Sequence, residues 1–413
     1  MNTTTASSDG ATPAAHSRRT WAVRRVIKML EQLQVGTLSV HWPDGETSHF
    51  GQDAGQGHAA ISLRNWEPIK QALRGGDIGF AKAYIEGHWH TPDLAGLLRL
   101  ILANRSALDQ AIYGHWAARL VYRLRHWTRR NSKANSSKNI TAHYDLGNAF
   151  YELWLDPTMN YSSAIFDGDF DRDLSEAQKI KVRRALHMAG VTAGSRVLEI
   201  GCGWGALAEM ATQEFDAAAV GLTLSPAQLE YANERLSRQG HSARADLRLQ
   251  DYRDLGDEQF DAICSIEMLE AVGQEYWATY FNTVAKALKP GGKACIQTIV
   301  IDDQHFDRYI KGSDFIQQMI FPGGCLPCPS AFKASAEAAG LEVIDAFAFG
   351  RDYAETLRRW RAEFMARFEQ AKKLGFDVPF QRTWEFYLAY CEAGFDAGDV
   401  DVVQYTLQKK ITA

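Results

Sequence analysis

From about Thr192 onward the sequence alternates between short apolar runs and longer amphipathic runs. Apolar runs of about four to eight residues predict buried strands, and the segments between them have helical spacing. Because successive strand–helix units need crossovers, they favour an α/β fold with a mostly parallel sheet and helices on both faces. Ligands of such sheets bind beyond the carboxyl ends of the strands. The predicted strands are 196–200, 218–224, 247–251, 260–266 and 293–300, and the predicted helices include 225–238 and 275–288.

Three glycines at alternate positions follow the first of these strands. Gly201, Gly203 and Gly205 stand between a strand and a helix, where the chain can turn sharply and approach a ligand with no side chain between them. A nucleotide-like ligand is therefore expected. With Ala206 the loop also satisfies the looser dinucleotide pattern G-x-G-x-x-A. Taken alone, it suits a nicotinamide cofactor as well as S-adenosylmethionine.

The residues after the next two strands separate these cofactors. A dinucleotide site needs an acid at the end of the second strand to hold the ribose, whereas here that strand ends in Leu-Thr-Leu-Ser-Pro at 222–226. Glu199 precedes the glycines and would meet the cationic methionine end of S-adenosylmethionine, although such an acid can also serve a helix N-terminus. Asp251 and Tyr252 would supply an acceptor and a ring beside the adenine. The sequence thus predicts an S-adenosylmethionine-dependent methyltransferase.

The first third of the chain differs in pattern from the rest. Residues 1–16 are small and polar and predict a disordered tail, and 17–118 predict a small accessory domain with a helix from Trp21 and a strand at 36–40. Residues 119–138 carry seven basic side chains and no acid, with apolar residues at helical spacing. This basic segment is typical of a helix on an anionic membrane surface or of a solvated charged face. The methyltransferase domain is predicted to span 139–413.

Composition excludes several classes of protein. No run approaches the roughly 20 apolar residues of a membrane span, and the N-terminus lacks the apolar core of a signal peptide. The net charge of -5 argues against general nucleic-acid binding. The six cysteines are scattered, and the single C-x-x-C at 325–328 has no second pair to complete a zinc site, so no metal is expected. A cytoplasmic enzyme is the expectation.

Motifs from about Gly75 to Thr406 resemble those of the cyclopropane-fatty-acid synthases, including the mycolic-acid cyclopropane synthases. They are Gly75-Gly-Asp-Ile-Gly-Phe80, Ala83-Tyr-Ile-Glu-Gly-His-Trp89, His143-Tyr-Asp-Leu-Gly-Asn148, Met159-Asn-Tyr-Ser-Ser-Ala164, Leu198 to Gly205, Gly221-Leu-Thr-Leu-Ser225, Gln250-Asp-Tyr-Arg-Asp254, Glu270-Ala-Val-Gly273, Phe321 to Pro327 and Asp352-Tyr-Ala-Glu-Thr-Leu357. The resemblance implies the seven-stranded Rossmann-like sheet of S-adenosylmethionine-dependent methyltransferases with a small N-terminal accessory domain.

The resemblance also implies the reaction. That family transfers the methyl group of S-adenosylmethionine to a cis double bond of a phospholipid acyl chain, and a bound bicarbonate removes a proton to close the ring. Expected partners are an unsaturated phospholipid, the inner membrane surface reached through the basic segment, and a second copy of the chain in a homodimer. The candidate cofactor-binding residues, from the loop and the resemblance together, are Tyr161, Ser162, Glu199, Gly201, Gly203, Gly205, Thr223, Leu224, Gln228, Asp251, Tyr252 and Ile266.

The bicarbonate site departs from the family pattern. Glu270 and Tyr353 match the family's glutamate and tyrosine, but Ser163 stands where a cysteine is usual and Gln297 where a histidine is usual. These four are the candidate catalytic residues. Serine and glutamine can still donate hydrogen bonds to an anion, whereas glutamine cannot take up a proton near neutral pH. Three outcomes stay open: a cyclopropane, a methyl- or methylene-branched chain without a ring, and a catalytically silent lipid-binding protein. A small-molecule methyltransferase is also compatible with the fold.

Overall fold

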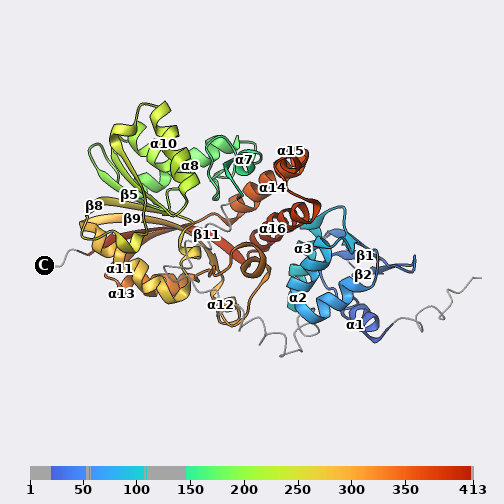
Figure 1. Cartoon of the computed structure of the whole chain (residues 1–413). Helices are drawn as coiled ribbons and strands as arrows, with labels where there is room; N and C mark the ends of the chain where they lie inside the picture. Colours follow the sequence, from blue (N-terminus) through green and yellow to red (C-terminus); the bar gives the residue numbers. More distant parts are fainter. Residues whose placement is uncertain (1–19, 53–54, 56, 107, 109–145, 411–413) are drawn as a thin grey trace, which may run out of the picture.

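The computed structural model describes residues 20–52, 55, 57–106, 108 and 146–410. The predicted disordered tail at 1–16 and the basic segment at 119–138 lie outside the described residues. The described part forms a seven-stranded sheet with its helices and, on the N-terminal side, a smaller four-stranded unit (Figure 1).

The large sheet confirms the predicted α/β architecture. Its strand order is β10-β11-β9-β8-β5-β6-β7. All pairs from β9 to β7 are parallel, whereas β11 pairs antiparallel with both β9 and β10. The strands are β5 (Arg196–Ile200), β6 (Ala218–Thr223), β7 (Ala245–Leu249), β8 (Phe260–Ile266), β9 (Leu288–Ile301), β10 (Leu341–Ala348) and β11 (Val400–Lys409). The expected strand at 293–300 is the C-terminal part of the longer β9.

Helices cover both faces of this sheet, as Figure 1 shows for α8 and α10 on one side and α11 and α13 on the other. The predicted helices match α10 (Pro226–Arg238) and α11 (Trp277–Ala287), the latter preceded by a 3-10 turn at Gln274–Tyr276. The other helices of this region are α7 (Asn148–Glu152), α8 (Leu174–Met188), α9 (Ala206–Gln213), α12 (Asp303–Tyr309), α13 (Pro329–Ala338), α14 (Gly350–Ala366), α15 (Phe368–Lys373) and α16 (Val378–Ala397), with a π-helical turn at Ile316–Ile320.

The N-terminal unit contains a small mixed sheet of order β2-β1-β3-β4. The helix expected from Trp21 and the strand expected at 36–40 are present as α1 and β1. The elements are α1 (Trp21–Leu30), β1 (Thr37–His41), β2 (Thr47–Phe50), β3 (His58–Leu63), α2 (Glu67–Ile85), β4 (Trp89–His90) and α3 (Leu94–Ala103). No helix among the described residues is long and apolar enough to cross a membrane.

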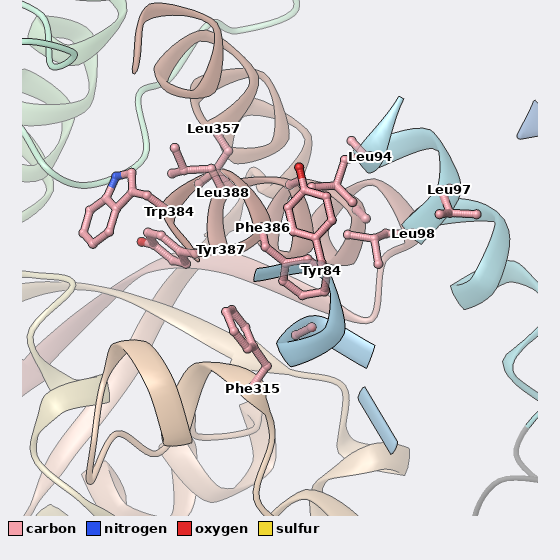
Figure 2. Packing of buried hydrophobic residues seen from close by; sticks show 14 of the residues in the cluster. Tyr84, Leu94, Leu97, Leu98, Phe315, Leu357, Trp384, Phe386, Tyr387 and Leu388 are labelled. Atoms are coloured by element: carbon pink, nitrogen blue, oxygen red, sulfur yellow. The ribbon is translucent and has the colours of Figure 1, made fainter. Parts of the chain in front are cut away.

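Helix α16 joins the two units. It packs against α14 on one side and against α2 and α3 on the other, and one apolar cluster runs through this contact (Figure 2). Polar contacts reinforce it: Arg99 of α3 pairs with Glu392 and Asp396 of α16, and the Tyr84 hydroxyl donates to Glu385 at 2.7 Å. The long C-terminal helix therefore connects the small unit to the elements around the catalytic sheet.

Candidate active site

The glycine loop begins directly after β5 and ends at the first turn of α9. All three glycines have positive φ, namely 86° at Gly201, 49° at Gly203 and 83° at Gly205, which side chains with a Cβ rarely adopt. Gly205 is the N-cap of α9, and a Cβ there would lie 2.9 Å from the Cβ of Ala232 in α10. The loop conformation thus depends on glycine for both backbone angle and helix packing.

A pocket opens beyond the carboxyl ends of β5, β6, β7 and β8, where the sequence placed the ligand. Of the predicted cofactor-binding residues, all except Gly205 line it: Tyr161, Ser162, Glu199, Gly201, Gly203, Thr223, Leu224, Gln228, Asp251, Tyr252 and Ile266. Gly205 lies behind this wall, against α10. The structure therefore brings together residues that are up to about a hundred positions apart in the sequence.

Glu199 meets the requirement for holding a cationic amino group. Its side chain is buried, and burial raises the pKa of its carboxyl to about 8, although the nearby Lys181 ammonium and a hydrogen bond from the Ala208 backbone both lower it. Its Oε2 atom has no hydrogen-bond partner among the described residues. A buried acceptor facing a pocket without a partner is costly. An ammonium group of the cofactor would satisfy it.

Hydrogen bonds within the pocket wall orient the other polar side chains that line it. The Thr223 hydroxyl donates to Gln228 Oε1 at 3.0 Å, while Ser225 caps α10 by accepting from the Gln228 backbone. Asp251 pairs with Arg253 at 2.5 Å beside Tyr252. These polar side chains are already oriented, so a nucleoside entering the pocket meets a prearranged surface.

Lys181, on α8, is a member of the site that the sequence analysis did not identify. Its side chain is fully buried, and its Nζ donates to Ser162 Oγ at 2.5 Å and to Asn160 Oδ1 at 3.3 Å. Burial lowers the pKa of its ammonium to about 8, against the attraction of Glu267, Asp156 and Glu199. Lys181 thus holds the 160–162 loop against the pocket.

Three of the four predicted catalytic residues converge on a carboxylate that the sequence analysis missed, that of Glu267. Its Oε1 accepts from the Ser163 backbone N–H at 2.8 Å and from Gln297 Nε2 at 2.7 Å, and its Oε2 accepts from the Tyr353 hydroxyl at 2.6 Å. The Ser163 hydroxyl donates instead to the Ala164 carbonyl. Glu267 also lines the cofactor pocket.

The fourth predicted catalytic residue, Glu270, lies near this cluster but makes different hydrogen bonds. Its Oε1 accepts from the backbone N–H of Ile299. Burial, followed by the negative charge of Glu267, raises the pKa of its carboxyl to about 8. The surroundings of the two carboxyls differ: the hydrogen bonds that Glu267 accepts oppose the rise in its pKa, whereas the negative charge of Glu267 adds to the rise at Glu270.

Comparison with known proteins identifies the family. The family model described as mycolic acid cyclopropane synthetase matches residues 131–405. The chain belongs to this family. It is 38% identical over 341 residues to the tuberculostearic acid methyltransferase of Mycobacterium tuberculosis, covering 81% of this chain and 79% of that one. It is 32% identical over 358 residues to the cyclopropane-fatty-acyl-phospholipid synthase of Escherichia coli K12, covering 86% and 90%.

Solved structures of the family share the fold. The cyclopropane synthase MmaA2 of Mycobacterium tuberculosis is 31% identical with a TM-score of 0.62, covering 66% of this chain and 98% of that one. The mycolic acid cyclopropane synthase CmaA1, solved as a complex with SAH and CTAB, is 34% identical with the same TM-score and the same coverage. The chain is accordingly an S-adenosylmethionine-dependent methyltransferase.

The raised pKa of Glu270 predicts a pH-dependent contribution to stability. A carboxyl whose pKa rises from 4.5 in the unfolded chain to about 8 stabilises the fold below pH 4.5, and this stability is lost as the pH rises through about 8. The Glu270→Gln variant has no ionisable carboxyl at this position, so it does not lose this stability as the pH rises. The difference in the free energy of unfolding, variant minus native, should therefore grow from pH 5 to pH 8.5 by an amount on the order of a few kcal/mol, and the difference in Tm should grow with it.

Thermal unfolding across this pH range measures the effect. Glu230→Gln, an exposed site on α10, is the matched control and should show a nearly constant difference. A Glu270→Gln difference that is flat with pH would show that Glu270 is ionised in the folded protein.

Proposed function

We propose that the protein transfers a one-carbon unit from S-adenosylmethionine to the double bond of an unsaturated phospholipid acyl chain. The observation that supports this most directly is that Glu267, which lines the cofactor pocket, accepts a hydrogen bond from the Tyr353 hydroxyl behind it. A proton acceptor beside a methyl donor is what the reaction needs, because an alkene that receives a methyl group must then lose a proton. The cyclopropane-fatty-acyl-phospholipid synthase of Escherichia coli, one of the relatives, is named for this substrate class.

Bound S-adenosylmethionine would supply an electrophilic methyl group. Glu199 would hold the amino group of its methionine end, and the glycine loop would let its backbone approach closely. Gln228 and Asp251 would accept hydrogen bonds from its polar groups, while Tyr161 and Ser162 would close over it from the loop that Lys181 holds. These contacts orient the methyl group and exclude water from it.

An aromatic wall suits the charge that develops on the acyl chain. Tyr161 lies in the pocket, and its ring is 5.5 Å from both Trp154 and Trp360. Trp360 in turn packs edge-on against Tyr353. Ring faces attract cations and bring no nucleophile that could capture a carbocation. The residues next to the proton acceptor therefore favour an alkene substrate over a small polar one.

Incubation with radiolabelled S-adenosylmethionine and phospholipid vesicles tests the proposal. Label should enter vesicles with cis-unsaturated chains and not matched vesicles with saturated chains. Absence of label from both would favour a catalytically silent lipid-binding protein. Proton NMR of the product lipid then separates a cyclopropane, with its high-field signals, from a methyl or methylene branch.

We further propose that the protein works at the inner membrane surface through the basic segment at 119–138. Replacing Arg123, Arg125, Arg129 and Arg130 by glutamine should weaken binding to anionic vesicles by about 1 kcal/mol per charge at low salt. The difference from the native protein should shrink as salt rises, because salt screens surface charges. Vesicle co-sedimentation measures this, with neutral phosphatidylcholine vesicles as the control, and equal binding at low salt would argue against the role.

A further inference from the structure

The hydrogen-bond donors around Glu267 are the groups on which a bound bicarbonate would depend. The Ser163 backbone N–H, the Gln297 amide and the Tyr353 hydroxyl come from a loop, from β9 and from α14, and all three point at one carboxylate. Because the Glu267 side chain already accepts from all three, a separate bicarbonate has no donor left among them. The residues present do not fit a bicarbonate site.

We infer that the Glu267 carboxylate is the enzyme's own proton acceptor and takes the place of bicarbonate. This inference rests on the proposed function, because it assigns the proton that the reaction releases. Glu267 lines the cofactor pocket with Ile266 and Met268, and its Oε2 accepts from the Tyr353 hydroxyl, so this side chain borders the space that the methyl donor would occupy. It would therefore contact the reacting acyl carbon directly.

The orientation of Gln297 is fixed by its neighbours. Gln404 Nε2, on the adjacent strand β11, donates to Gln297 Oε1 at 2.9 Å, and Arg184 donates to Gln404 Oε1 at 2.7 Å. With its oxygen accepting, the Gln297 amide must turn its NH₂ toward Glu267. The Arg184–Gln404–Gln297 hydrogen-bond chain thus turns an N–H donor toward Glu267. A donor stabilises the ionised form of a carboxylate.

The groups around Glu267 act in opposite directions on the pKa of its carboxyl. Burial raises the pKa of its carboxyl, and the three donated hydrogen bonds and the Lys181 ammonium oppose this rise. The pKa of Tyr353 is raised well above its usual value, so the phenol stays protonated and donates. The pKa of the Glu270 carboxyl is also raised, to about 8. A carboxylate with a raised pKa is a stronger base than that of an ordinary glutamate.

The backbone at Glu267 has a strained conformation that sets the direction of its side chain. Its φ is 49°, in the left-handed region, which costs a non-glycine residue about 1 kcal/mol or more. The Glu267 N–H donates to the Gln297 carbonyl at 2.8 Å, which extends the pairing of β8 with β9 past the end of β8. Strain that persists at a pocket-lining acid is typical of a functional position.

Glu267 is the only proton acceptor that this step needs. After the acyl chain has gained the methyl group, it carries a positive charge on the neighbouring carbon. If a C–H bond of the new methyl group then breaks, its electron pair closes a cyclopropane ring; if a C–H bond on a carbon next to the charge breaks, its electron pair forms a new double bond. In either case the proton passes to a Glu267 oxygen, the acyl chain loses its charge, and the proton leaves to solvent before the next turnover.

Two variants and one buffer change test this inference. Glu267→Gln keeps the size of the side chain but removes its basicity, so lipid labelling should fall by about 10²- to 10⁴-fold while SAH binding is retained. Glu267→Gly suits a φ of 49° and leaves the three donors around a space for a small anion. Added formate should bind to Glu267→Gly by titration calorimetry and restore part of its labelling. Native protein should label lipid at the same rate in bicarbonate-depleted and bicarbonate-supplemented buffer.

Three results would overturn the assignment. The first is a native labelling rate that falls when bicarbonate is depleted and recovers when it is added. The others are formate binding of equal affinity to the native and Glu267→Gly proteins, and a Glu267→Gln variant that labels lipid as fast as the native protein. Glu230→Gln is the matched control for the amide substitution. If native protein labels no lipid at all, the proposed function fails, but the calorimetric comparison still decides whether Glu267 occupies an anion site.

Discussion

Replacing Gly205 by alanine is expected to weaken SAH binding by about 10- to 100-fold, although Gly205 does not itself line the pocket. An added Cβ would lie 2.9 Å from the Ala232 Cβ and 3.4 Å from its Cα, on the rigid backbone of α10. It would also force a φ of 83° on a residue that disfavours it, at about 1–2 kcal/mol. Because Gly205 caps α9, relief of both contacts must move the glycine loop. Titration calorimetry with SAH measures the loss.

Gly240→Ala is the matched control for this prediction. Gly240 also has a positive φ, 75°, but no atom lies within 4 Å of an added Cβ, and it follows α10 at a distance from the pocket. It should therefore lose stability to backbone strain while it binds SAH with native affinity. Equal SAH affinities for the native protein and Gly205→Ala would mean that the helix packing behind the loop does not determine its shape.

The parallel sheet and the glycine loop could be predicted because their signals are local. A buried strand, a sharp turn and a helix each leave a pattern within a few neighbouring residues, and the strand order then places the loop at the ligand edge. Thr223 and Gln228 were inferred from the family resemblance, and the structure places them at the end of the second strand and in the first turn of the next helix.

Glu267 was missed because its role depends on contacts that are distant in sequence. It follows a buried strand directly, where an acid is easily taken for a strand-end charge in solvent. Its backbone is in the left-handed region, and its partners are 104, 30 and 86 positions away. The sequence did reveal the unusual Ser163 and Gln297 separately. What joins them is the carboxylate that both contact, and only the folded chain places it between them.

Lys181 was missed for a different reason. It stands in α8 among Lys179, Arg183 and Arg184, a basic run that is typical of a solvated helix face. The other three side chains pair with Glu176, Glu214 and Gln404, whereas Lys181 is fully buried among Glu199, Glu267 and the 160–162 loop. Helical spacing alone does not reveal which of several neighbouring cations turns inward.

Lys181→Met is expected to affect stability and cofactor binding together. Removing one partner of a buried ionic cluster leaves its carboxylates uncompensated, which typically costs about 3–5 kcal/mol and should lower Tm by several degrees. Ser162 and Asn160 would also lose the donor that holds their loop at the pocket. Lys181 lowers the pKa of Glu199, which is about 8 in the native protein, so its loss would raise that pKa further and disfavour the ionised form that meets the cofactor's amino group. SAH affinity should fall at least about 10-fold.

Lys179→Met separates this effect from the simple loss of a lysine. Lys179 lies two residues away on the same helix, exposed and paired with Glu176 at 2.7 Å, and such surface pairs contribute at most about 1 kcal/mol. The control should keep native SAH affinity and nearly native Tm. Repeating the titrations at higher pH adds a second test, because ionisation of Glu199 above its raised pKa should recover part of the affinity of Lys181→Met. If the affinity loss is the same at every pH, Lys181 acts only by holding the 160–162 loop, and its charge does not tune Glu199.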